Sequence, residues 1–138
     1  MGLVRYQRIN GLRDSRGSLF PIEANRDIPF AIKRVYFMRD LLPDAPRGFH
    51  AHRQLQQVAF CLSGSCSIVL DNGRDTESVE ISDPGVGLLI DKLVWHEMHS
   101  FSKDCVLMLI ASDFYDESDY IRDYENFKSI CGKAQTTK

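Results

Sequence analysis

Short runs of alternating apolar and polar residues, separated by Gly, Pro, Asn and Asp, occupy most of the chain up to residue 111. In an extended strand, such alternation places successive side chains on opposite faces. The pattern predicts strands at residues 3–9, 18–23, 32–38, 47–52, 57–62, 65–70, 75–81, 86–90, 93–101 and 106–111. Ten short strands at close intervals indicate an all-β barrel or sandwich.

Turn residues predict how some of these strands connect. Ser63-Gly64 predicts a two-residue hairpin between residues 57–62 and 65–70, which would set Cys61 directly opposite Cys66. Asp71-Asn72-Gly73 is the strongest turn signal in the chain and leads into residues 75–81.

The C-terminal part of the chain has a different pattern. Between Ser118 and Phe127, the aromatic residues Tyr120, Tyr124 and Phe127 recur at helical spacing, and acidic residues that favour a helix N-terminus precede them. We therefore expect one short helix that packs on the barrel through these rings.

Length and composition narrow the class of protein. The 138 residues fit a single domain, residues 1–138, and the net charge of −2 gives no reason to expect nucleic acid or an anionic membrane as a partner. The sequence contains no apolar run of signal-peptide or membrane-spanning length, so we expect a cytoplasmic protein. The four cysteines form no CxxC pair, and we expect free thiols in a reducing compartment, with a Cys61–Cys66 bridge as the alternative.

The candidate chemistry centres on Arg47-Gly48-Phe49-His50-Ala51-His52. Alternation places His50 and His52 on one strand face with Gly48, so two imidazoles converge there. Arg47 adds a cation suited to phosphate or carboxylate. The cluster indicates a metal site or proton-transfer chemistry, and the alternative is a pair of surface histidines on a half-exposed strand.

A second polar strand face lies upstream, in residues 32–38. Alternation places Arg34, Tyr36 and Met38 on the same face, so Arg34 and Tyr36 could belong to the pocket that contains the histidines. The alternative is that Tyr36 is an ordinary strand aromatic whose hydroxyl faces water.

The spacing of His50 and His52 with Gln57 and Gly64 resembles the first cupin motif, and Gly85-Val86-Gly87 with His96 loosely resembles the second. The resemblance implies a cupin jelly-roll barrel, to which the short C-terminal helix is added. Gln57 stands where cupins normally have a glutamate ligand, and a neutral amide weakens the binding of a hard divalent ion. We therefore expect no metal, with a metal-dependent cupin oxygenase or isomerase as the alternative.

A closer resemblance extends over nearly the whole chain. Its strings are Ile28-Pro29-Phe30 with Ile32-Lys33-Arg34-Val35-Tyr36, Arg47-Gly48-Phe49-His50-Ala51-His52, Val86-Gly87-Leu88, Trp95-His96-Glu97-Met98, and Ala111-Ser112-Asp113-Phe114-Tyr115-Asp116-Glu117. Together they resemble the dTDP-4-keto-6-deoxyglucose 3,4-ketoisomerases, metal-free cupins that supply 3-keto sugars for amination in bacterial surface-glycan pathways.

The resemblance implies an isomerase without metal or redox cofactor, acting on a dTDP-linked 4-keto-6-deoxyhexose as a homodimer that exchanges an N-terminal strand. Catalysis would fall to His50, His52 and Tyr36. The substrate-binding residues would be Arg16, Arg34, Arg47, Gln57, Trp95 and His96. Arginine at position 16 and histidine at position 96 resemble the FdtA-like branch, whose product has the galacto configuration.

Moving a carbonyl from C4 to C3 needs a base at C3, a group that stabilises the enediolate and an acid at C4. Near neutral pH a histidine can accept and return a proton. We expect His50 to be the base, Tyr36 to donate to a sugar oxygen, and His52 to be a second proton carrier or to fix its neighbours' tautomers. The alternatives are a dTDP-sugar 3,5-epimerase and a non-catalytic sugar-binding cupin.

Overall fold

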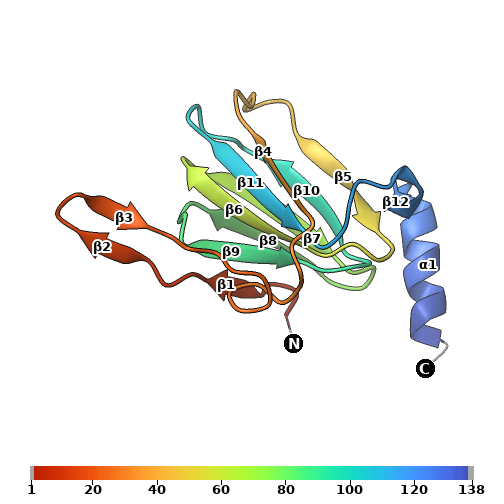
Figure 1. Ribbon diagram of the computed structural model, residues 1–138. Coiled ribbons are helices and arrows are strands. Elements are labelled where there is room, and N and C mark those ends of the chain that lie inside the picture. Colours follow the sequence, from red (N-terminus) through yellow and green to blue (C-terminus); the bar gives the residue numbers. More distant parts are fainter. Residues whose placement is uncertain (1, 137–138) are drawn as a thin grey trace.

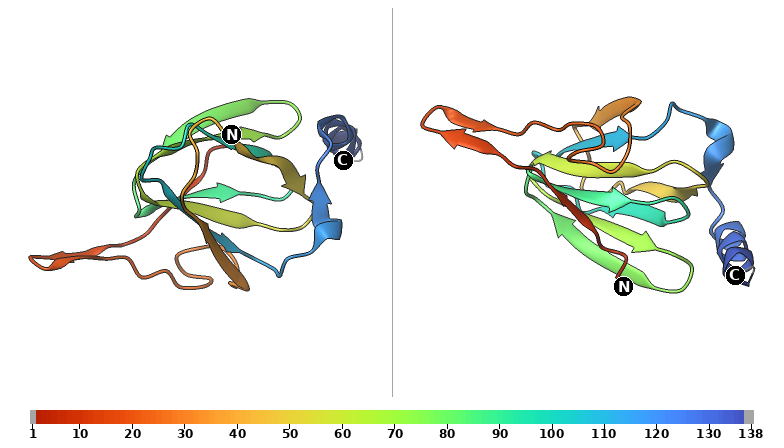
Figure 2. Two further views of the ribbon diagram at one scale, coloured as in Figure 1. Left: turned by 90° about the horizontal axis from the view of Figure 1, so that it is seen from above. Right: turned by 60° about the horizontal axis from the view of Figure 1, so that its bottom comes forward.

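Two five-stranded antiparallel sheets form the body of the protein in this computed structural model, which describes residues 2–136, with side chains up to residue 133. The first sheet has the order β1 (Tyr6–Arg8), β9 (Val86–Ile90), β6 (Gln57–Ser63), β11 (Val106–Ala111) and β4 (Arg34–Met38). The second has the order β12 (Tyr120–Ile121), β5 (Arg47–His52), β10 (Trp95–His99), β7 (Cys66–Asp71) and β8 (Thr76–Ile81). The sheets face each other across the interior (Figures 1 and 2), which confirms the expected all-β jelly roll.

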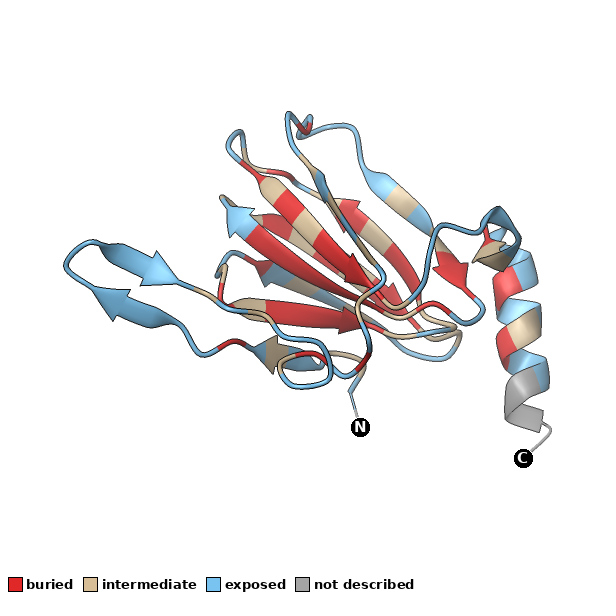
Figure 3. Ribbon diagram, viewed as in Figure 1, coloured by how far each residue is buried: buried red, intermediate tan, exposed pale blue. Residues whose placement is uncertain are grey.

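Apolar residues from both sheets fill the space between them. The largest of these clusters includes Ala59, Ile68, Leu88, Leu107 and Leu109, all fully buried. Figure 3 shows the buried positions concentrated along β6, β9 and β11, in the middle of the first sheet. The run from Val106 to Ala111 is a central strand of that sheet, as its almost continuous apolar character predicts.

The hairpin expected at Ser63-Gly64 is absent, because β6 and β7 belong to different sheets. The short connection instead pairs with the loop after β10: Ser65 N–H donates to Ser102 Oγ, and Ser102 N–H donates to the Ser65 carbonyl. Gly64 has a φ of +70°, and a Cβ there would lie 2.1 Å from Ser102 Oγ. The chain therefore crosses between the sheets here, since both strands bury apolar faces in the same core.

Cys61 and Cys66 are consequently not cross-strand partners. Both side chains lie buried in the core between the sheets, and Cys61 Sγ is 3.9 Å from Cys105 Sγ. All four cysteines are free thiols, as expected.

The hairpin at Asp71-Asn72-Gly73 is confirmed by the antiparallel pairing of β7 with β8. The Asp71 carboxylate accepts a hydrogen bond from Gly73 N–H, and Gly73 has a φ of +89°, which a glycine adopts without steric cost.

The predicted N-terminal strands are shorter than expected. Only Tyr6–Arg8 of residues 3–9 forms a strand, which pairs with β9 of the same chain. Residues 12–19 form a separate hairpin of β2 (Leu12–Asp14) and β3 (Gly17–Leu19), where the sequence had predicted a strand at 18–23. This hairpin projects from the body at the end away from the C-terminal helix (Figures 1 and 2).

The C-terminal helix begins later than predicted. A short 3₁₀ turn, η1 (Glu117–Asp119), and the strand β12 precede α1, which spans Tyr124–Thr136. Pairing of Tyr120 with His52 overrides the helical spacing, so Tyr120 faces the barrel instead of lying on the helix. Phe127 is fully buried against the outer face of the second sheet and fixes α1 there. No helix in residues 2–136 has the length and apolar character to span a membrane.

Candidate active site

Strands β5 and β10 bring three histidines together. His96 pairs directly with His50, and the ring centroids lie 5.0 Å apart for His50 and His52, 4.6 Å for His50 and His96, and 5.7 Å for His52 and His96. Sequence alternation had predicted the first pair, and the structure adds His96 from the neighbouring strand. The pairing contains a bulge next to His96, where Gly48 has a φ of +93° and Phe49 a φ of +60°.

Backbone carbonyl groups fix the tautomers of two of these rings. His50 Nδ1 lies 3.0 Å from the Gly48 carbonyl oxygen, and His96 Nδ1 lies 3.2 Å from the Val94 carbonyl oxygen. A carbonyl only accepts hydrogen bonds, so we assign the proton to Nδ1 in both rings. Nε2 of His50 and His96 therefore carries the free lone pair that a base needs.

Burial keeps these imidazoles neutral. Desolvation is the largest cause that lowers the pKa of His50, and it lowers the pKa of His52 and of His96 to about 3. The mutual repulsion of the imidazolium forms and the cations Arg34 and Arg122 contribute to the low pKa of His52. His52 and His96 are buried, whereas His50 is half-buried and faces a pocket.

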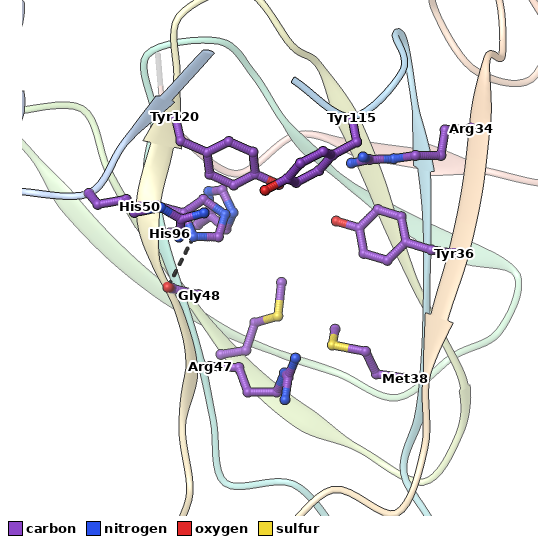
Figure 4. A pocket seen from close by; sticks show the side chains of 11 residues that line it. Arg34, Tyr36, Met38, Arg47, Gly48, His50, His96, Tyr115 and Tyr120 are labelled. Atoms are coloured by element: carbon purple, nitrogen blue, oxygen red, sulfur yellow. Dashed lines mark hydrogen bonds between the residues drawn. The ribbon is translucent and has the colours of Figure 1, made fainter. Parts of the chain in front are cut away.

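The opposite wall of the pocket comes from β4. Arg34, Tyr36 and Met38 point inward together, as alternation predicted, while Val35 and Phe37 are exposed on the outer face. The Tyr36 hydroxyl donates a hydrogen bond to Gln57 Oε1, and burial raises the pKa of Tyr36 to about 12. Figure 4 shows the Tyr36 hydroxyl aimed across the pocket toward the histidines.

The pocket has a volume of about 320 Å³ and is open to solvent on one side. Its lining consists of Arg34, Tyr36, Met38, Arg47, Gly48, His50, His96, Met98, Tyr115, Tyr120 and Arg122. Three of these residues are arginines and none of the described lining residues is acidic, so the pocket attracts anions. Arg34 Nε is buried without a hydrogen-bond partner, which leaves a donor available to a ligand.

Tyr115, Tyr120 and Arg122 are lining residues that the sequence analysis missed. They follow β11 along the chain and return to the pocket because β12 pairs with the end of β5. The only sequence signal was the string around Ala111–Glu117, which contributed to the family resemblance without indicating a role for its tyrosine.

Two predicted site residues lie behind the pocket wall. His52 packs against His50 and borders a second cavity of about 200 Å³, which also contacts Arg34 and Tyr120. Gln57 is buried and reaches the pocket only through its hydrogen bond to Tyr36. Both residues therefore contact side chains that line the pocket and do not line it themselves.

Two other predicted residues lie away from the pocket of their own chain. Trp95 precedes His96 on β10, so its side chain points to the opposite face and packs against Tyr124 and Phe127 under α1. This placement corrects the predicted contact of Trp95 with substrate. Arg16 lies at the exposed tip of the β2–β3 hairpin, where it pairs with Asp14.

The three histidines could in principle hold a metal ion, since one nitrogen from each lies within 4.8 Å of the other two. Three imidazoles form the protein ligands of some catalytic zinc sites. The cupin pattern adds an anionic fourth ligand, however, and this chain offers Gln57, whose Oε1 accepts the Tyr36 hydroxyl. The residues present therefore do not complete the cupin ligand set.

Comparisons with known proteins identify the family of this chain. The family described as FdtA (WxcM-like, C-terminal) matches residues 3–132. A TDP-4-oxo-6-deoxy-alpha-D-glucose-3,4-oxoisomerase from Aneurinibacillus thermoaerophilus is 54% identical over 125 residues, which are 91% of this chain and 90% of that protein.

Solved structures give the same result. QdtA, a sugar 3,4-ketoisomerase from Thermoanaerobacterium thermosaccharolyticum solved with TDP, superposes with a TM-score of 0.92 at 44% identity, covering 95% of this chain and 96% of QdtA. A histidine-to-asparagine mutant of QdtA, solved with TDP-4-keto-6-deoxyglucose, gives a TM-score of 0.93 at 42% identity, covering 96% of each chain. The resemblance predicted from the sequence motifs is thereby confirmed, and the protein belongs to the FdtA family of cupin-like sugar 3,4-ketoisomerases.

Proposed function

We propose that this protein converts dTDP-4-keto-6-deoxy-D-glucose into the 3-keto isomer through an enediol. The observation that carries the proposal is the neutral His50, which has an unprotonated Nε2 and lines a pocket that contains three arginines. Arg34, Arg47 and Arg122 supply positive charge for the diphosphate, and the histidines and Tyr36 supply the acid-base groups. The family match does not favour the two alternatives, a 3,5-epimerase and a non-catalytic sugar-binding cupin.

His50 is the base in this mechanism. Its Nε2 removes the C3 proton, while the Nδ1–H that remains bound to the Gly48 carbonyl holds the ring in place. With a pKa of about 12, Tyr36 stays protonated at neutral pH. Its hydroxyl donates to Gln57 Oε1 in the free protein, and it can donate to the enediolate oxygen when that oxygen replaces Gln57 Oε1 as the acceptor. The protonated His50 then returns the proton to C4, while the hydroxyl proton of O3 passes to O4, so that the carbonyl forms at C3 and O4 becomes a hydroxyl.

His52 and His96 have narrower roles than expected. His52 is buried behind His50, so we assign it the positioning role and not that of a proton carrier in contact with substrate. His96 has a pKa of about 3, so its ring is neutral at physiological pH. It can donate to C4 only a proton that it first receives from His50, whose ring centroid lies 4.6 Å away.

The family resemblance implies exchange of an N-terminal strand in the first ten residues, but β1 pairs with β9 of its own chain. We therefore propose a homodimer of single-domain chains in which the β2–β3 hairpin is the exchanged element instead. Leu12 and Leu19 on this hairpin are about three-fifths exposed, with relative accessibilities of 62% and 61%, and burying them against a partner would stabilise the dimer. The arrangement would also bring Arg16 to the partner's pocket.

Light scattering is expected to give twice the chain mass of 15.8 kDa, and the mass of a single chain would contradict the dimer.

We infer a cytoplasmic location. The four free thiols support it, because cysteines stay reduced in that compartment.

Replacing His50 with asparagine is expected to lower the kcat of isomerisation by about 10²- to 10⁴-fold, because the base is removed. The measurement is exchange of the C3 proton of dTDP-4-keto-6-deoxyglucose with solvent, followed by proton NMR, together with calorimetry for TDP affinity, which should not change. The matched control is His99→Asn, since His99 lies on the same sheet and pairs with Glu97 outside the pocket. Near wild-type exchange in His50→Asn would remove His50 from the base role, and C5 exchange in the native protein would indicate an epimerase.

Metal removal is expected to leave turnover unchanged, because Gln57 replaces the anionic ligand and the proposed steps use only protein side chains. The measurement is kcat before and after exhaustive chelation, with the metal content determined by mass spectrometry. Loss of activity that one specific divalent ion restores would contradict the metal-free mechanism.

The product is expected to have the galacto configuration, dTDP-3-keto-6-deoxy-D-galactose, for use in deoxyamino-sugar biosynthesis. The planar enediol takes its C4 configuration from the face that meets the proton donor, and we propose that His96 and the partner's Arg16 set that face. Proton NMR of fresh product should show a small H4–H5 coupling. The double variant Arg16→Tyr with His96→Arg should shift the product toward the gluco epimer, whereas a large coupling from the native protein would contradict the assignment.

A further inference from the structure

Tyr120 covers the catalytic histidines from the side of the C-terminal segment. Its strand, β12, pairs with β5 so that Tyr120 lies opposite His52. The Tyr120 ring centroid is 4.4 Å from that of His52 at an interplanar angle of 65°, and 4.9 Å from that of His50 at 58°. Figure 4 shows the Tyr120 ring beside His50 at the end of the pocket that the C-terminal segment closes.

The position of Tyr120 is fixed by its neighbours in sequence. The Asp119 carboxylate accepts hydrogen bonds from the backbone N–H groups of Gln54 and Leu55, and the Asp119 carbonyl accepts one from Arg53 N–H. These three bonds attach the start of β12 to the loop that follows β5. Tyr120 therefore cannot move independently of the strand that carries the histidines.

A cation lies against the same ring. The Arg122 guanidinium carbon lies 4.3 Å from the Tyr120 ring centroid, and Arg122 Nε is 2.9 Å from Glu117 Oε1. Arg122 therefore occupies a face of the ring, which is the surface that would otherwise attract an imidazolium. Its positive charge acts in the same direction as burial, since it lowers the pKa of His50 and of His52.

We propose that Tyr120 is a positioning residue that keeps His50 and His52 neutral and in place by excluding water from one side of both rings. The role rests on the proposed function, in which neutral His50 is the base. Nothing in the reaction requires the Tyr120 hydroxyl itself, so the ring, and not the oxygen, is the functional part.

Other charged and titratable groups surround the two histidines and also set their protonation. They are Arg34 and Tyr36 from β4, His96 from β10, Glu117 from η1, and Arg122 after β12. Of these, Glu117 raises the pKa of His50, and Arg122 lowers it. A test must therefore change the Tyr120 ring while leaving these groups in place.

The test compares Tyr120→Ala and Tyr120→Phe. Removing the ring admits water, so the pKa of His50 should rise toward its ordinary value near 6.5. The acid limb of the kcat/KM profile should then move to higher pH, so that kcat/KM of the variant falls below the native value on the acid side and matches its own plateau only at higher pH. Tyr120→Phe keeps the ring, so its acid limb should stay at the native pH whatever its kcat.

Direct titration of the histidine C2 protons by NMR, in protein without substrate, gives a second readout that does not depend on activity. Tyr120→Thr, a strand-forming replacement, serves if Tyr120→Ala does not fold. Tyr124→Thr is the matched control, because Tyr124 packs on Trp95 at the outer face of the sheet, away from the three histidines.

Unchanged His50 titration in Tyr120→Ala or Tyr120→Thr would overturn the proposal, as would a Tyr120→Phe variant that shifts as far as Tyr120→Ala. A shift of the same size in Tyr124→Thr would also overturn it. Failure of the proposed function is a separate result, since the native protein would then lack isomerase activity whatever its histidines do in the titration.

Discussion

The site depends on holding three imidazoles in contact while all of them are neutral. Three imidazolium cations with centroids about 5 Å apart would repel one another strongly in a wall where two of the rings are buried and the third is half-buried. Burial prevents this repulsion because it favours the uncharged form of each ring. The carbonyls of Gly48 and Val94 accept hydrogen bonds from Nδ1 of His50 and His96, and so determine that Nδ1 carries the proton in these two rings. The same conditions that remove charge from the cluster leave a free Nε2 on His50, which is what proton abstraction requires.

This arrangement has a cost in stability. His52 and His96 have a pKa of about 3 in the folded protein, below the value of about 6.5 expected for an unfolded histidine. As pH falls below 6.5, the unfolded chain takes up protons that the folded protein does not, so the folded state loses stability until the pH approaches 3. The apolar core between the sheets must supply the stability that the cluster does not.

The pocket has three walls, and each comes from a different part of the chain. One wall, from β5 and β10, holds the histidines, and the facing wall, from β4, holds Tyr36 and Arg34. The C-terminal segment forms a third wall with Tyr120 and Arg122. Each wall belongs to a different part of the chain, so the site exists only when both sheets and β12 have assembled.

The sequence by itself determined the strand-rich fold, the shared face of His50 and His52, and the inward face of Tyr36, because side chains alternate strictly along a strand. It also determined that Gln57 occupies the position of a metal ligand, since that is a matter of residue type and spacing.

Only the tertiary structure decided which strands pair. It separated β6 from β7 into different sheets, turned Trp95 away from the pocket, and drew Tyr120 out of the expected helix to lie against His52. Local periodicity contains no information on contacts between residues far apart in the chain. Those contacts are set by how two sheets and a helix bury their apolar faces together.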